Sequence, residues 1–226
     1  MTLQENKVYN MDCLDLMQEM YRGGHQADCL LTDIPYDGVN RNDNGLRTLT
    51  KGNADIITFD LNKFLDLADK VVSGVFMIFC EFRQFSFIAE WFANKGYTVR
   101  TIVWNKTNPS PMNGEYVYLS GVELCVYAKK KGGTFNARCK NTVFNYPCGI
   151  NEIHPTQKPL PLWYELLKDN TNEGQLVLDT CMGSFTTAIA CHRLGRRFIG
   201  AELDKDYYDK GQARLQAELS QVSMFD

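Results

Sequence analysis

The stretch from Asp33 to Tyr36 carries the clearest chemical signal in the chain, because only Thr32 separates it from the apolar residues 29–31. A carboxylate at the end of a buried strand can accept a hydrogen bond from an exocyclic amine, and a turn carbonyl can accept a second. An aromatic ring beside them can stack on a flat base. Asp and Pro are also common turn residues for local steric reasons. The candidate catalytic residues are Asp33, Ile34, Pro35 and Tyr36.

A second pattern, from Leu176 to Thr187, predicts a strand, a turn and the start of a helix, whose first N–H groups are free to bind a ligand. A further short strand ends at Glu202. A strand–turn–helix–strand unit with a terminal acid is typical of nucleoside-cofactor sites, although an ordinary unit of this kind is the alternative. Because Gly183 is the single glycine in the turn, S-adenosylmethionine fits better than a dinucleotide.

The two patterns together resemble those of amino-group DNA methyltransferases (adenine N6 or cytosine N4) of the β motif order. In that order a D-P-P-Y-type catalytic motif precedes a D-P-F-x-G-S-G-T cofactor motif. Residues 154–159, His-Pro-Thr-Gln-Lys-Pro, and residues 10–14, Asn-Met-Asp-Cys-Leu, are two further matches. The resemblance covers nearly the whole chain, and the ordered set of four is far more specific than any member.

The resemblance implies one methyltransferase domain over residues 1–226, an α/β fold with a doubly wound, mostly parallel sheet of the Rossmann-like class I type. The alternation of predicted strands and helices agrees. It also implies methyl transfer from S-adenosylmethionine to the exocyclic amine of a base flipped out of double-stranded DNA, without a metal. Adenine is favoured over cytosine because the cytosine-N4 branch more often carries Ser at the position of Asp33. Homodimers are frequent in this group.

The cofactor residues follow from the matched motifs. Glu202 is expected on the ribose hydroxyls, Asp12 with Cys13 on the adenine, and Lys158 or Thr156 on the methionine carboxylate. Thr156 is equally suited to cap the helix that follows it. The full set of expected cofactor residues is Asp12, Cys13, Thr156, Lys158, Asp179, Cys181, Gly183, Ser184, Thr186, Glu202 and Leu203.

Two regions are expected on the DNA side: an active-site loop at residues 37–58 and a DNA-recognition insertion at residues 105–153. The net charge of −3 means that DNA contact depends on local basic patches. The lysine run 129–131 is the strongest of these, although such runs are often only solvated turns. The expected DNA-binding residues are Arg41, Arg47, Lys51, Lys106, Lys129, Lys130, Lys131, Arg138 and Lys140.

Two departures from the family pattern leave alternatives open. Ile34 replaces a proline and keeps its carbonyl, whereas Phe185 replaces a glycine beside the cofactor turn. We expect Phe185 to pack as a core residue; if it filled the pocket, the chain would be a catalytically weak DNA-binding paralogue or accessory subunit. An RNA methyltransferase is disfavoured because no RNA-binding module is visible. The eight cysteines contain no C-x-x-C pair, and no long apolar stretch is present, so we expect reduced thiols and a cytoplasmic protein without membrane partners.

Overall fold

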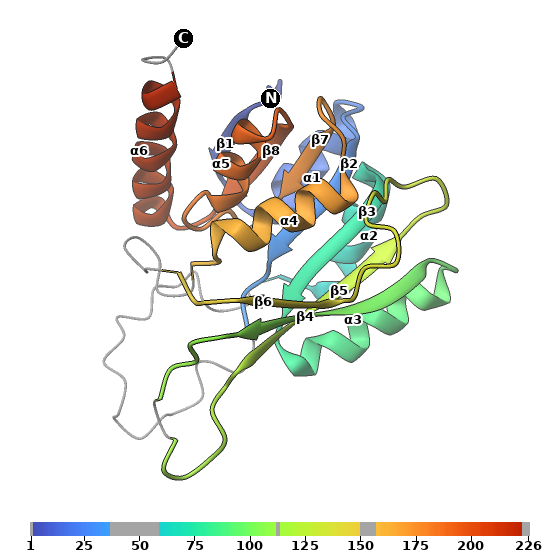
Figure 1. Ribbon diagram of the computed structural model, residues 1–226. Coiled ribbons are helices and arrows are strands. Elements are labelled where there is room, and N and C mark those ends of the chain that lie inside the picture. Colours follow the sequence, from blue (N-terminus) through green and yellow to red (C-terminus); the bar gives the residue numbers. More distant parts are fainter. Residues whose placement is uncertain (1, 37–58, 112–113, 150–156, 223–226) are drawn as a thin grey trace.

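The computed structural model describes residues 2–36, 59–111, 114–149 and 157–222. Its centre is one eight-stranded sheet in the order β1-β8-β7-β2-β3-β5-β4-β6 (Figure 1). The strands are β1 (Lys7–Asn10), β2 (Ala27–Asp33), β3 (Val72–Cys80), β4 (Thr98–Lys106), β5 (Val122–Lys129), β6 (Val143–Tyr146), β7 (Leu176–Asp179) and β8 (Arg197–Glu202). Strand β5 runs antiparallel to both of its neighbours, and the other pairs are parallel. The prediction of a mostly parallel sheet is confirmed.

Helices cover both faces of this sheet. They are α1 (Cys13–Arg22), α2 (Leu61–Val71), α3 (Phe82–Asn94), α4 (Leu160–Asn170), α5 (Thr186–Arg193) and α6 (Lys205–Val222). Successive strand side chains point to opposite faces, so Leu30 and Phe76 pack with α1, α2 and α3, whereas Leu31 and Met77 pack with α4, α5 and α6 (Figure 1). Burial on both faces explains why β2 and β3 read as nearly continuous apolar runs. The doubly wound architecture is therefore confirmed.

The chain winds in opposite directions from β2 and β7, which lie side by side in the sheet. Such a switch point opens a crevice at the carboxyl ends of the strands, where ligands bind in open α/β sheets. The hydroxyl groups of Thr32 and Thr180 lie 3.1 Å apart and connect the two strand ends. The two motifs that carry the chemical signals in the sequence therefore meet at this crevice.

Residues 105–153 do not form one separate insertion. They include β5, which lies between β3 and β4, and β6, which extends the sheet beyond β4. The connection from β4 to β5 lies at the edge of the sheet where β2 ends, because Asn105 pairs with Val122 there. Residues 37–58 lie outside the described part of the chain. None of the helices in the described residues is long and apolar enough to cross a bilayer.

Candidate active site

The turn after β2 is fixed from two sides. The Ile34 N–H donates to the Phe79 carbonyl of β3 at 3.1 Å, and the Ile34 side chain is buried. Gln84, in the first turn of α3, donates from its side-chain amide to the Pro35 carbonyl at 2.9 Å. These contacts hold the backbone beyond Asp33 at a constant orientation, as a site that positions a flat substrate requires.

Asp33 belongs to a cluster of charged side chains at this turn. Lys158 Nζ lies 2.5 Å from Asp33 Oδ2 and 2.8 Å from Glu123 Oε2. The Tyr36 hydroxyl lies 3.2 Å from Asp33 Oδ1 and 3.3 Å from Glu123 Oε2. Lys106 Nζ lies 2.8 Å from the other Glu123 oxygen. Two carboxylates and two ammonium groups thus balance one another around the phenol of Tyr36.

The pKa values of these groups follow from burial opposed by charge. Burial raises the pKa of Asp33 to about 6, although the ammonium group of Lys158 acts against the rise. Burial acts in the same direction on Glu123, but Lys158 and Lys106 outweigh it and hold its pKa at about 2. The carboxylates around Lys158 overcome its own burial and raise its pKa well above the usual value. At neutral pH both acids and Lys158 are therefore predominantly charged.

Glu202 ends β8 as a buried carboxylate with few donors. Its oxygens accept hydrogen bonds from the Gly183 N–H at 2.7 Å and the Asp204 N–H at 2.9 Å. Burial raises its pKa to about 7 despite these two bonds. The side chain of Leu203 beside it is half-exposed. A carboxylate with this little compensation is suited to a ligand that brings hydroxyl donors, next to an apolar surface that can cover a base.

The turn between β1 and α1 lies beside Glu202. Parallel pairing of β1 with β8 sets Asn10 opposite Glu202, so Asp12 and Cys13 follow at this edge. The carboxylate of Asp12 caps α1 by accepting from the Leu14 N–H at 2.8 Å. A hydrogen bond with Cys13 raises the pKa of the Cys181 thiol. The structure thus brings together Asp12, Cys13, Cys181, Gly183, Glu202 and Leu203, as the motifs indicated.

Other expected cofactor residues hold the turn after β7. Buried Asp179 accepts from the Cys181 N–H at 3.1 Å and from the Thr187 hydroxyl, and burial raises its pKa to about 6. The Ser184 and Thr186 hydroxyls lie 3.1 Å apart, and Arg214 of α6 donates to the Ser184 carbonyl at 2.7 Å. These bonds fix the shape of the turn; direct contact with a cofactor stays a prediction.

Phe185 packs in the core, as expected. Its side chain is fully buried, and its ring meets Tyr208 of α6 edge-on at a centroid distance of 5.9 Å. The residue caps α5 in the left-handed conformation, with φ 62°. Glycine adopts that conformation without strain, which gives a physical reason for the family's glycine at this position. The large side chain lies under the helix and not in the cofactor crevice.

Comparison with known proteins agrees with this geometry. Residues 27–213 match the model of the DNA methylase family whose members modify N6 or N4 amino groups. The chain belongs to the N6/N4 DNA methylase family. Among curated relatives, the Type II methyltransferase M2.DpnII of Streptococcus pneumoniae is 27% identical, over 84% of this chain and 83% of its own. The putative methylase YubD of Escherichia coli K12 is 30% identical, over 91% and 88%.

Solved structures of methylases show the same fold. The M1.HpyAVI–SAM complex superposes with a TM-score of 0.76 at 28% identity, covering 92% of this chain and 98% of that chain. The cytosine-N4-specific PvuII DNA methyltransferase superposes with a TM-score of 0.70 at 15% identity, covering 93% and 86%, and supports the fold alone. This methylase therefore has the class I methyltransferase fold. S-adenosylmethionine in the M1.HpyAVI complex agrees with the cofactor expected from the sequence.

The structure does not bring the lysine run 129–131 of the methylase to the site. Lys129 pairs with Val75 near the start of β3, whereas Asp33 pairs with Phe79 near its end. A rise of about 3.3 Å per residue separates the two levels by roughly 13 Å along the strands. Lys130 Nζ binds Asp69 at 2.9 Å, and it also donates to two backbone carbonyls. The run thus lies toward the end of the strands opposite to the one that carries Asp33, and the expected DNA contact lacks geometric support.

The remaining expected DNA residues fall into three groups. Lys106 lies in the charged cluster with Glu123. Lys140 binds Glu165 at 2.7 Å and Asp169 at the end of α4, and exposed Arg138 belongs to the same segment, away from the site. Arg41, Arg47, Lys51 and the cofactor candidate Thr156 lie outside the described residues.

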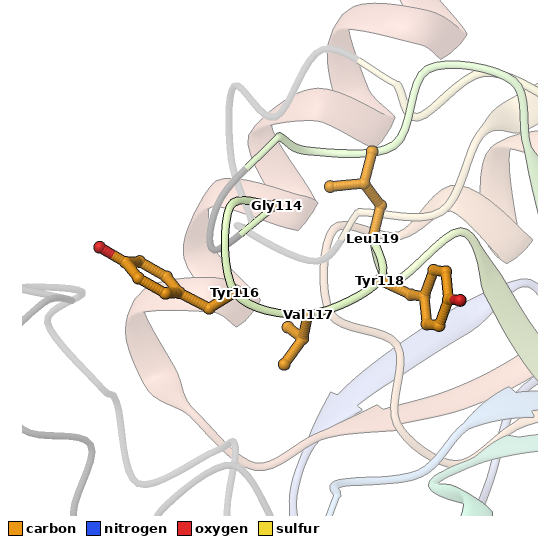
Figure 2. Close-up of a pocket in the computed structure, with 5 residues that line it drawn as sticks. All are labelled: Gly114, Tyr116, Val117, Tyr118 and Leu119. Atoms are coloured by element: carbon orange, nitrogen blue, oxygen red, sulfur yellow. The ribbon is translucent and has the colours of Figure 1, made fainter.

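An exposed apolar loop joins β4 to β5 and was not expected from the sequence. An open pocket on this loop is lined by Gly114, Tyr116, Val117, Tyr118 and Leu119, and Figure 2 shows the four side chains pointing in different directions from the loop. Tyr116 is 83% exposed and Tyr118 is fully exposed. The signal in the sequence was the run Tyr-Val-Tyr-Leu between two glycines, where a solvated turn would carry polar residues.

Sequence reasoning also missed Glu123 and Gln84. Glu123 is the one acid within the apolar strand at 122–129, and that contrast was a usable sign of a buried partner. Gln84 stands three residues after Glu81, and the two form a capping box at the start of α3. The second role of Gln84, on the Pro35 carbonyl, depends on how α3 packs and left no sign in the sequence.

Proposed function

We propose that this protein is an S-adenosylmethionine-dependent DNA methyltransferase that modifies the N6 amine of adenine. One observation carries the proposal: the Asp33–Tyr36 turn and the turn after β7 adjoin at the switch point of the sheet, where Thr32 and Thr180 connect them at 3.1 Å. A base site and a cofactor site on adjacent strand ends can bring an amine and a methyl group into contact.

The residues present fit the cofactor. The ribose hydroxyls of S-adenosylmethionine can donate to Glu202, which accepts only two backbone N–H groups in the described structure. Leu203 and Cys13 offer apolar contact to the adenine ring, and Asp12 precedes Cys13 at the same strand ends. When bound, the sulfonium group supplies the methyl group that is transferred.

On the substrate side, the chain prepares the amine for attack. Asp33 and the Ile34 carbonyl accept hydrogen bonds from the two N–H groups of the amine, which frees the nitrogen lone pair that is otherwise delocalised into the ring. Tyr36 stacks on the flipped-out base, and stacking returns part of the few kcal/mol spent on extrusion, roughly 1–3 kcal/mol. A nitrogen–carbon bond forms as the sulfur–carbon bond breaks, and the amine proton passes to Asp33. That side chain is 21% exposed, so it can release the proton to water.

We place the DNA at the sheet edge that carries these residues. Lys106 and the loop from Gly114 to Leu119 border the site there, because β5, which follows the loop, carries Glu123 as its second residue. Exposed aromatic side chains can contact bases that lose their stacking when one base is extruded. Contact with double-stranded DNA thus depends on this edge more than on the net charge, which is −3.

The decisive experiment is methyl incorporation into unmethylated duplex DNA with labelled S-adenosylmethionine, followed by nucleoside mass spectrometry. N6-methyladenine in the product, absent with Asp33→Ala, is the expected result. N4-methylcytosine in the product would show that the target base is cytosine and not adenine. Product on RNA and not on DNA would make this an RNA methyltransferase. Absence of product together with absence of cofactor binding would identify an accessory paralogue.

A further inference from the structure

Lys158 occupies a position that no cofactor contact explains. It precedes α4, its side chain is 5% exposed, and its Nζ lies within 3.3 Å of oxygens of Asp33, Glu123 and Tyr36. The same nitrogen lies 5.6 Å from the centres of the Tyr36 and Phe79 rings. An ammonium group with three oxygen partners is fully occupied as a donor. This nitrogen therefore serves the base side of the crevice.

Glu123 holds that lysine from the neighbouring strand. One carboxylate oxygen lies 2.8 Å from Lys158 and the other lies 2.8 Å from Lys106. The antiparallel register sets Leu124 opposite Cys80, so Glu123 projects at the level of the turn that follows β2. Glu123 thus connects the cation of the catalytic turn to a second cation at the outer side of the site.

Without Lys158, Asp33 and Glu123 would be two partly buried carboxylates that share the phenol proton of Tyr36, with Lys106 left on Glu123 alone. Two such acids cannot both stay ionised at little cost. The groups whose charge acts on Asp33 or that sense its charge are Lys158, Glu123, Tyr36, Cys80, Cys125 and Asp179, with Lys106 acting through Glu123. In this set Lys158 is the cation in direct contact with Asp33.

We infer that Lys158 and Glu123 are positioning residues for methyl transfer: Lys158 keeps Asp33 ionised and oriented toward the base amine, and Glu123 keeps Lys158 in place. This inference rests on the proposed function, and it replaces the expected contact of Lys158 with the methionine carboxylate of the cofactor.

The two variants Lys158→Met and Glu123→Gln test the inference through single-turnover pH–rate profiles with saturating DNA and cofactor. Loss of the Lys158 ammonium group in Lys158→Met should move the acid limb of the pH–rate profile to higher pH by at least about one unit. The rate at pH 7 should fall by at least about twofold and largely return at pH 9, because the ionised fraction of Asp33 controls it. Glu123→Gln removes a negative charge near Asp33, so the acid limb of its profile should move to lower pH. Its maximal rate should fall, because Lys158 loses the ion pair that holds it in place. Lys158→Arg keeps the charge and should restore the wild-type limb.

Cofactor affinity separates the two roles of Lys158. The dissociation constant for S-adenosylmethionine, measured by calorimetry, should change by less than about threefold in Lys158→Met, because Lys158 is not expected to contact the cofactor. Removal of a single charged contact with the cofactor would weaken binding by more than that. A large loss of affinity with an unmoved acid limb would return Lys158 to the cofactor. Limbs that stay in place or move together in Lys158→Met and Glu123→Gln would overturn the inference. An inactive wild-type protein would instead refute the proposed function.

Discussion

At the scale of single residues, the site shows how burial and charge compete. Asp33 must leave water to meet a base, and burial alone would favour its protonated form, a poor acceptor for an amine. Lys158, at 2.5 Å, opposes that effect and leaves the pKa of Asp33 at about 6. A carboxylate with this pKa is ionised at pH 7 and still basic enough to take up a proton during the reaction.

Asp33→Ala is expected to abolish methyl transfer and to leave cofactor affinity within about twofold, because Asp33 contacts the base and not the cofactor. General-base and positioning groups contribute about 10²–10⁴-fold to a rate. Single-turnover incorporation of labelled methyl groups measures the first effect and calorimetry with S-adenosylmethionine the second. Wild-type turnover in the variant would remove Asp33 from the catalytic site.

Glu202 makes stability depend on pH. Its pKa rises from 4.5 to about 7 on folding, so its stabilising effect is present below pH 4.5 and is lost as pH rises through about 7. The free energy of unfolding of the cofactor-free wild type should therefore fall between pH 5 and pH 8. In Glu202→Gln this fall should be smaller by up to roughly 3 kcal/mol. Urea unfolding at both pH values measures it. An equal loss in the variant and the wild type would show that Glu202 is not desolvated.

At the scale of elements, Phe185 fastens α5 to α6. A Cβ atom added at Gly211 would lie 2.3 Å from the Phe185 ring, so the ring fills the space that this helical glycine leaves. The left-handed backbone at Phe185 costs about 1–2 kcal/mol, whereas burial of a phenylalanine contributes about 3–5 kcal/mol. Packing outweighs strain, which explains how a large residue persists in a turn that favours glycine.

Phe185→Gly should consequently lower the free energy of unfolding by about 1–4 kcal/mol and leave the dissociation constant for S-adenosylmethionine unchanged. Gly211→Ala should be destabilising in the wild-type background and neutral or stabilising beside Phe185→Gly, because the clash disappears. A double-mutant cycle of urea unfolding tests the pair. Tighter cofactor binding by Phe185→Gly without loss of stability would mean that the ring obstructs the pocket.

Local sequence patterns were sufficient for the strand ends and insufficient for contacts across strands. Asp33 and Glu202 could be placed because each ends a buried strand, and parallel strand ends meet at one edge. Lys158 could not be assigned to Asp33 from the sequence, because their contact depends on where the segment before α4 crosses the sheet. Lys130 appeared to be a DNA ligand for a similar reason: a lysine run does not reveal that Asp69 and two carbonyls bind one of its members.

At the scale of the whole molecule, the two edges of the sheet differ in character. The edge with Asp33 carries Lys106 and the exposed loop with Tyr116 and Tyr118, whereas the lysines of residues 129–131 lie toward the other edge. A nearly balanced net charge gives little general attraction to DNA, so which edge is used depends on local contacts. This difference allows the two edges to be tested against each other in one protein.

The double variant Tyr116→Ala/Tyr118→Ala should weaken binding to duplex DNA by at least tenfold, because contacts between aromatic side chains and bases contribute about 1–3 kcal/mol each. Its melting temperature and cofactor affinity should match the wild type, since both rings are exposed. The matched control, Lys129→Ala/Lys131→Ala, should change DNA affinity by less than about twofold and leave its salt dependence unaltered, because each lost phosphate contact would lower the log–log slope by about 0.9. A flattened slope in the lysine variant, with normal binding by the tyrosine variant, would place the DNA on the opposite edge.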